Sequence, residues 1–191
     1  MKFIKFLTTT LIFTSVLSVA SFVQAKDFTI DDSMGSVSVH IEHEVGFNTG
    51  VFQKFSGTLS YSDDLSKVTA FDLVIDAASL QTFNDDKDEY LKTEEFLNVK
   101  QFPTITIKSK KIGKDSVSAE VTILGKTKKI NFEFHNYGIQ KNKSGQSVAI
   151  AVFQGVINRR DFGIDYNVRS RKTNKELLGY EINLIVHLNA K

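Results

Sequence analysis

The side chains best suited to acid–base or metal chemistry near neutral pH are the four histidines, His40, His43, His135 and His187. Histidine has an ordinary pKa near neutrality, so each is a candidate general base or metal ligand. His40 and His43 lie in a segment that alternates apolar and polar residues, as a β-strand does. Their spacing would point the two rings to opposite faces of such a strand. The pair is therefore not expected to chelate one metal ion.

His43 differs from the other histidines in the face that it occupies. It shares the parity of Val39 and Ile41, which places it on the apolar face of the expected strand, whereas the other three histidines fall on polar faces. Two interpretations stay open. His43 either contacts a ligand inside the fold or is a core histidine whose ring nitrogens find hydrogen-bond partners in the protein.

A second candidate lies between residues 157 and 164, where charged side chains interrupt an apolar run. The string reads Ile-Asn-Arg-Arg-Asp-Phe-Gly-Ile. One interpretation is a turn fixed by an Arg–Asp pair. The other is that Arg159 or Asp161 lies at the opening of a barrel and binds a polar head group. Arginine suits that role because its fork donates several hydrogen bonds at fixed geometry.

The sequence lacks the common catalytic signatures. It contains no Gly-x-Ser-x-Gly, no His-Glu-x-x-His, no phosphate-binding loop and no Gly-x-Gly-x-x-Gly. The acidic pairs Asp63-Asp64 and Asp85-Asp86 occur in turn and helix-start contexts, which account for them. The chain has no cysteine, which excludes disulfides and thiolate sites. We therefore predict a protein that is not an enzyme, with no catalytic residues, no metal site and no cofactor.

The first 25 residues resemble a secretory signal peptide. Lys2 and Lys5 precede an apolar stretch over 6–19, and Val23 and Ala25 occupy the −3 and −1 positions. We expect cleavage after Ala25 and one domain over 26–191. No second apolar run approaches the roughly 20 residues of a membrane-spanning helix, so we do not expect an integral membrane protein.

The charge of the segment 26–191 gives no reason to expect a nucleic-acid or anionic-membrane partner. The whole chain has 24 basic and 22 acidic residues, and Lys2 and Lys5 account for the entire excess. The segment that remains is therefore neutral overall, and a neutral protein has no general attraction to polyanions.

Period-two alternation predicts an all-β domain. About eight segments alternate or are continuously apolar, and a possible ninth lies near 28–30. The eight are 37–41, 54–61, 71–76, 104–108, 117–123, 130–135, 148–157 and 180–188. Strands with one apolar face can close into an antiparallel barrel, and eight strands make one wide enough for a slender ligand. A two-sheet sandwich is the alternative, because alternation alone does not separate the two.

One segment is polar and not strand-like. Asn84 is a suitable helix N-cap, and the acidic residues that follow it favour a first helical turn. We predict one or two short helices near residues 83–98, lying across one end of the barrel.

Six short motifs, in the same order along the chain, resemble those of the YceI-like family of exported, lipocalin-like barrels. They are Ser38–His43 followed by Gly46-Phe47, Phe55–Leu59, Ile75–Leu80, Asp88–Lys92 with Phe96–Val99, Phe102–Thr106 and Asn158–Gly163. Two positions depart from the family pattern. Lys87 stands where the family usually has arginine, and Tyr90 where it often has histidine.

The resemblance implies a function in lipid binding. Proteins of this family hold polyprenyl chains, isoprenoid quinones or fatty-acid amides, they often form homodimers, and no reaction is assigned to them. We therefore predict a periplasmic carrier for a long-chain amphiphilic lipid. The alternatives are a fatty-acid or fatty-amide binder, an enzyme that acts on a bound lipid with His43 as acid or base, and an interaction domain with a solid core.

Residue roles follow from apolar-face parity and from the motifs, and all of them depend on a hollow barrel. The predicted lumen residues are Phe55, Phe71, Ile105, Ile107, Phe132 and Ile182, with Tyr90, Leu91 and Phe96 as a cover. The predicted mouth residues are Phe47, Phe162, Ile164 and Tyr166, and the predicted head-group contacts are His43, Arg159 and Asp161.

Overall fold

A computed structural model describes residues 25–44 and 46–191. The predicted signal peptide lies outside the described residues, apart from Ala25. The strands are β1 (Lys26–Thr29), β2 (Ser36–His43), β3 (Gly46–Phe52), β4 (Phe55–Tyr61), β5 (Val68–Asp76), β6 (Leu80–Gln81), β7 (Thr104–Ile112), β8 (Ser116–Ile123), β9 (Lys126–Lys141), β10 (Ser147–Asn158) and β11 (Leu178–Ala190). The helical elements are α1 (Asp85–Leu91) and two 3₁₀ turns, η1 (Ala77–Ser79) and η2 (Arg159–Phe162).

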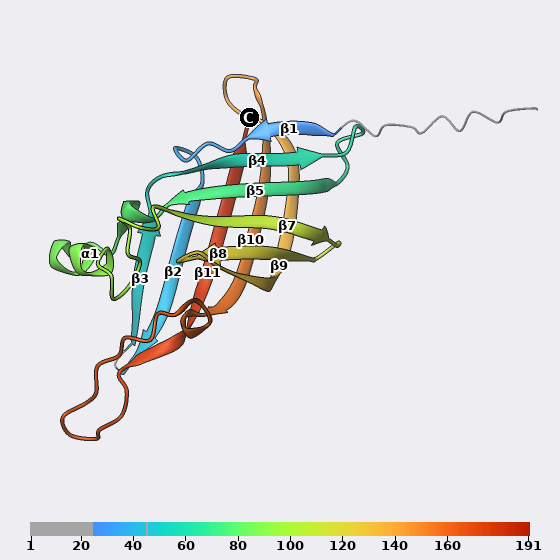
Figure 1. Ribbon diagram of the computed structural model, residues 1–191. Helices are drawn as coiled ribbons and strands as arrows, with labels where there is room; N and C mark the ends of the chain where they lie inside the picture. The colour runs from blue at the N-terminus through green and yellow to red at the C-terminus, as the bar shows by residue number, and fades with distance from the viewer. Residues whose placement is uncertain (1–24, 45) are drawn as a thin grey trace, which may run out of the picture.

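The strands form one antiparallel sheet in the order β1-β4-β5-β7-β8-β9-β10-β11-β2-β3-β6. The sheet curls, so that β4, β5, β7 and β8 cross β2, β11 and β10 (Figure 1). At one end β1 meets β11, where the Thr29 amide donates to the Lys191 carbonyl at 2.8 Å and the Lys191 amide donates to the Thr29 carbonyl at 2.9 Å. The predicted all-β antiparallel fold is confirmed, as one curled sheet that encloses its own apolar face.

The predicted strand set omits β3 and β6. β3 reads Gly-Phe-Asn-Thr-Gly-Val-Phe, in which glycine and asparagine weaken the strand pattern. Pairing with β2 nevertheless makes it a strand, from Gly46 opposite His43 to Phe52 opposite Val37. The tertiary structure explains why residue 50 is glycine, because a Cβ atom there would lie 2.7 Å from Leu80 Cδ1.

The predicted helical segment contains α1. The Asn84 side chain accepts a hydrogen bond from the Lys87 amide at 2.9 Å, as expected of an N-cap. The Asp88 carboxylate is buried and accepts from both the amide (2.7 Å) and the hydroxyl (2.6 Å) of Thr82. These bonds fix α1 beside β6 and β3, outside the sheet (Figure 1).

The interior has a solid end, built largely from aromatic rings. Phe71 and Phe134 both pack on Phe153, with ring centroids 4.2 and 5.0 Å away. Phe28 meets Tyr61 edge to face, and the Tyr61 hydroxyl donates to Asn136 Oδ1 at 2.6 Å. Such close contacts leave no room for a ligand between these rings.

Candidate functional site

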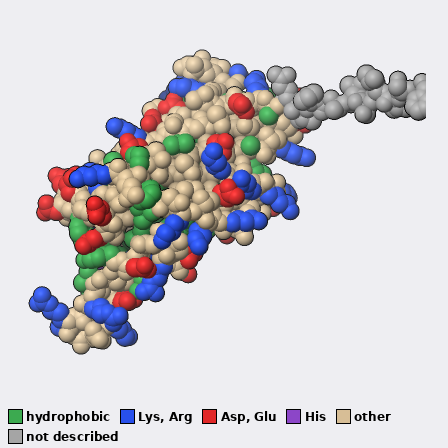
Figure 2. Space-filling view, viewed as in Figure 1, with side chains coloured by type: hydrophobic (Ala, Val, Ile, Leu, Met, Phe, Trp, Pro, Cys, Tyr) green, Lys and Arg blue, Asp and Glu red, His purple; other side chains and the backbone are tan. Residues whose placement is uncertain are grey.

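The other end of the interior is hollow. A cavity of about 500 Å³ lies between the curled sheet, α1 and the loop that joins η2 to β11. Its walls are almost entirely apolar. Tyr90 (39 % exposed) and Val168 (47 % exposed) line the cavity and also reach the surface, and we call the opening beside them the mouth. Hydrophobic side chains gather on this part of the surface, between α1 and the protruding loop (Figure 2).

Many of the predicted ligand-contacting residues meet at this cavity. The sheet provides some, α1 and the turn after it provide others, and η2 and the following loop provide the rest. The predicted residues that line the cavity are His43, Tyr90, Leu91, Phe96, Ile105, Arg159, Ile164, Tyr166 and Ile182.

The other predicted residues do not line the cavity. Phe55, Phe71, Ile107 and Phe132 lie in the packed core, Phe162 is fully buried in it, and Phe47 and Asp161 are exposed. Alternation identifies the inward face of a strand, but it does not say how far along the barrel a residue lies. Phe71 and Phe132 do point inward, toward the solid end.

Sequence reasoning also missed part of the lining. Val39, Ile41, Ile75, Val121 and Ile123 contribute to the cavity wall and have the inward parity that the sequence shows. They could have been found from that parity. Leu177 and Leu178 close the wall from the η2–β11 loop and the start of β11, where no periodic pattern marks them.

Arg159 fixes the η2–β11 loop from inside the protein. The side chain is 2 % exposed. Its Nε donates to the Gly179 carbonyl at 2.8 Å, and its Nη1 donates to the carbonyls of Ile164 at 2.8 Å and Tyr166 at 2.7 Å. Burial lowers the pKa of this guanidinium from its ordinary value.

Within the described residues, Asp161 pairs with neither Arg159 nor Arg160, and the Arg–Asp ion pair at this turn joins Arg160 to Asp165 at 3.6 Å. Among the described residues, Arg159 makes no ion pair, and its strong hydrogen bonds go to backbone carbonyls instead. The Asp161 side chain is exposed. Arg159 is therefore part of the cavity wall and also the residue that attaches the loop to the end of β10.

An aromatic cluster joins α1 to the loop at the mouth. The ring centroids of Tyr90, Phe96 and Tyr166 are 4.9 to 5.6 Å apart. The Tyr90 hydroxyl donates to the Glu95 carboxylate. This hydrogen bond is the main reason that the pKa of Tyr90 is raised above its ordinary value, and a hydrogen bond with Tyr166 contributes less. Tyr90 stays neutral at physiological pH, and the cluster covers one side of the cavity.

The polar groups of the cavity are few and lie in its wall. They include His43, Asn48, Thr82, Lys87 and Arg159. Lys87 Nζ donates to Asn48 Oδ1 at 3.0 Å. Among residues 25–44 and 46–191, no group of three or more His, Cys, Asp or Glu side chains could bind a metal ion. Such a cavity can accommodate an apolar chain and orient a polar end with a small number of hydrogen bonds.

Solved structures with the same fold exist. A mutant of the YCEI protein of Campylobacter jejuni is 23% identical, with a TM-score of 0.66 over 78% of this chain and 87% of that one. A polyisoprenoid binding domain from Saccharophagus degradans is 13% identical, with a TM-score of 0.62 over 86% of this chain and 97% of that one. In the described part of the chain, no helix is long and apolar enough to cross a bilayer.

Sequence comparison is more specific. A UPF0312 protein of Staphylococcus aureus (strain bovine RF122 / ET3-1) is 30% identical over 159 residues, which cover 82% of this chain and 92% of the relative. The model of the YceI-like domain matches residues 28–190. The motifs, the curled antiparallel sheet and this match agree, and the chain belongs to the YceI-like family.

Proposed function

We propose that the protein is a non-catalytic carrier that binds a long-chain amphiphilic lipid, such as a polyisoprenoid or an isoprenoid quinone, in its cavity. The observation that carries this proposal is the apolar cavity of about 500 Å³ at one end of an otherwise packed interior. Its volume lies within the roughly 300–1,000 Å³ typical of small-molecule sites. The polyisoprenoid binding domain of Saccharophagus degradans, which has the same fold, supports the choice of ligand class.

The physical basis of binding is the transfer of an apolar chain out of water. Each buried methylene contributes about 0.8 kcal/mol, so a few isoprene units give a large gross stabilisation. Ordering the flexible chain offsets much of it, and affinity does not rise in proportion to buried area. The tail would provide most of the affinity, and the polar groups of the wall would select the head group.

We place this carrier in the periplasm. The predicted signal peptide over residues 1–25 supports export, and a protein that shields a lipid tail from water is useful in an aqueous compartment next to membranes. Fractionation of the native host, with cleavage after Ala25 checked by mass spectrometry, tests the location.

The test of the ligand is to purify the protein from its own host and identify what it retains. We expect native mass spectrometry and organic extraction to find a molecule with an isoprenoid tail in stoichiometric amount. A straight-chain fatty acid or fatty amide would instead establish the alternative ligand class. A protein that is consistently empty, and that takes up neither lipid when loaded, would contradict the carrier proposal.

Phe132 provides a control that separates stability from binding. It is 2 % exposed and lies against Gly155, where a Cβ atom would be 2.5 Å from Phe132 Cδ1. Because Phe132 does not line the cavity, we expect Phe132→Leu to lower the free energy of unfolding by about 1 kcal/mol and to leave lipid affinity unchanged. Urea unfolding and lipid titration measure the two effects. A large loss of affinity in the folded variant would place Phe132 in the binding site.

A further inference from the structure

The loop between η2 and β11 protrudes from the body of the protein (Figure 1). Arg171, Lys172 and Lys175 are exposed near its end, and we call these three residues the basic tip. Glu176 pairs with Arg169 at 3.3 Å. Within the described residues, none of the three cations of the basic tip is in an ion pair with a carboxylate.

The same loop forms part of the mouth of the cavity. Val168 and Leu177 line the cavity, and the Leu177 amide donates to the Val168 carbonyl at 2.8 Å. Arg169 and Glu176 pair as an isolated antiparallel bridge one step further out. The loop is therefore a short, hydrogen-bonded hairpin that presents the basic tip beyond the mouth. The exposed Val168 side chain lies between the basic tip and the mouth.

The helix on the other side of the mouth carries exposed acidic side chains. Asp85, Asp86 and Glu89 are on α1, and all three are exposed. In the space-filling view, acidic side chains gather over α1 and basic ones lie at the end of the protruding loop, while further basic side chains are spread over the β7–β9 part of the surface (Figure 2). Charge is therefore uneven locally around the mouth, with exposed carboxylates on α1 and the basic tip on the loop, in a chain that is nearly neutral overall.

We propose that the basic tip docks the mouth of the cavity onto an anionic lipid bilayer. Clustered lysine and arginine side chains are attracted to anionic membrane surfaces, and acidic side chains are repelled. Because the mouth lies between α1 and the loop, attraction at the basic tip would tilt the loop side of the mouth onto the bilayer, with the acidic side chains of α1 on the side farther from it. This proposal rests on the proposed carrier function for its purpose, because docking would let a lipid tail enter the mouth with little exposure to water.

The test uses vesicles made of phosphatidylglycerol and phosphatidylcholine, with vesicles of phosphatidylcholine alone as the neutral reference. We expect the protein to float with the anionic vesicles at low salt and not with the neutral ones. Binding should weaken as salt is raised, because the screening length falls from about 10 Å at 0.1 M to about 3 Å at 1 M. The variant Arg171→Glu, Lys172→Glu, Lys175→Glu should bind at least a hundredfold more weakly, at roughly fivefold for each cation lost.

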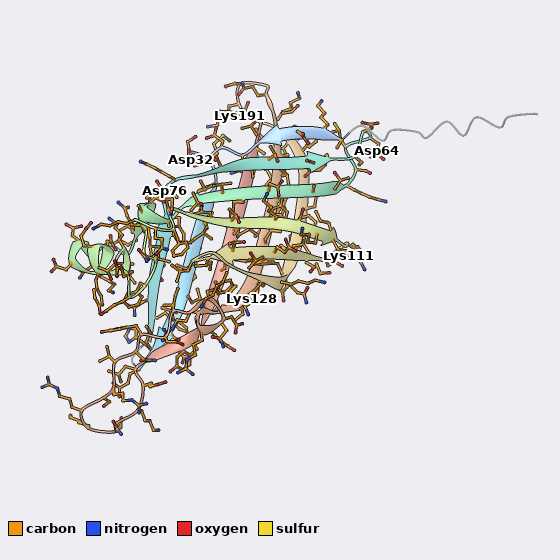
Figure 3. The ribbon with its side chains drawn as sticks, viewed as in Figure 1. Asp32, Asp64, Asp76, Lys111, Lys128 and Lys191 are labelled. Atoms are coloured by element: carbon orange, nitrogen blue, oxygen red, sulfur yellow. The ribbon has the colours of Figure 1, made fainter. Side chains whose placement is uncertain are left out.

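A matched variant controls for net charge. Lys111→Glu, Lys114→Glu and Lys143→Glu change the charge by the same amount on exposed residues in other parts of the protein. Lys111 lies at the end of β7 that points away from the protruding loop (Figure 3). We expect this control variant to keep most of its binding to anionic vesicles.

The outcomes separate docking from lipid carriage. The docking proposal is overturned if the wild-type protein ignores anionic vesicles, or if the two triple variants lose binding equally. Lipid loading in detergent-free solution is measured on the same samples, and the basic-tip variant should load normally because its substitutions lie outside the cavity. Vesicle binding that depends on the basic tip in a protein that never retains lipid would leave docking in place and refute the carrier function.

Discussion

Replacing Arg159 with methionine is expected to destabilise the protein by about 3 kcal/mol or more, at roughly 1 kcal/mol or more for each carbonyl that loses its donor, and to abolish lipid binding. Methionine retains an unbranched aliphatic side chain like the stem of arginine, but it leaves the carbonyls of Ile164, Tyr166 and Gly179 without their donor. The carbonyls of Ile164 and Tyr166 belong to the loop that forms one wall of the cavity, and that of Gly179 belongs to the start of β11. Loss of the donor should release that wall, so affinity should fall even in the molecules that remain folded.

The measurements are urea unfolding and lipid titration below the unfolding midpoint. Arg159→Lys tests the geometry, since lysine keeps the charge but cannot reproduce the fork, and we expect an intermediate effect. Arg160→Met is the matched control. Arg160 is exposed, lies over the Tyr180 ring, and forms long ion pairs with Asp165 at 3.6 Å and Glu176 at 4.0 Å, so its replacement should cost about 1 kcal/mol, well below the effect at Arg159. Equal effects of the two methionine variants would disprove the loop-fixing role of Arg159.

The second large effect is expected from filling the cavity. Ile182 lies on β11, opposite Ile41 on β2 and Ile157 on β10, and all three line the cavity. Ile182→Trp should occupy space that the lipid tail needs. If the larger ring displaces about three methylenes of the lipid tail from the cavity, the binding free energy weakens by roughly 2.4 kcal/mol, which lowers affinity about sixtyfold. The fold should tolerate the change, because the ring enters an existing cavity and not a packed core.

The binding measurement is equilibrium retention of a labelled isoprenoid quinone by the purified variant. Val156→Trp is the control, since Val156 is on the neighbouring strand β10 and is 48 % exposed. The control should bind as the wild type does. Wild-type affinity in a folded Ile182→Trp variant would mean that the tail does not use this part of the cavity.

Much of the fold follows from short-range patterns in the sequence. Alternation predicted the strands that form most of the sheet, because a strand with one buried face must place every second side chain inward. The N-cap at Asn84 and the acids after it predicted α1. β3 escaped prediction, since its glycines and asparagine become a strand only by pairing with β2.

The candidate site was predictable in part, and the residues show why. Ile105 and Phe71 have the same sequence signature, an apolar side chain at an inward position. Only the crossing of the strands decides that Ile105 faces the cavity while Phe71 packs on Phe153. The role of Arg159 was also undetermined, since its partners are backbone carbonyls up to 20 residues away, which no side-chain motif records.

The sequence by itself determined the all-β class, the helical segment after Asn84 and the membership of the chain in its family, because periodicity, capping and ordered motifs are local properties. The tertiary structure alone decided where the interior is hollow and where it is solid. That depends on how side chains from strands far apart in the sequence meet or fail to meet. The same is true of charge, because composition gives only its sum, and folding decides that exposed carboxylates of α1 and the basic tip lie on two sides of the mouth.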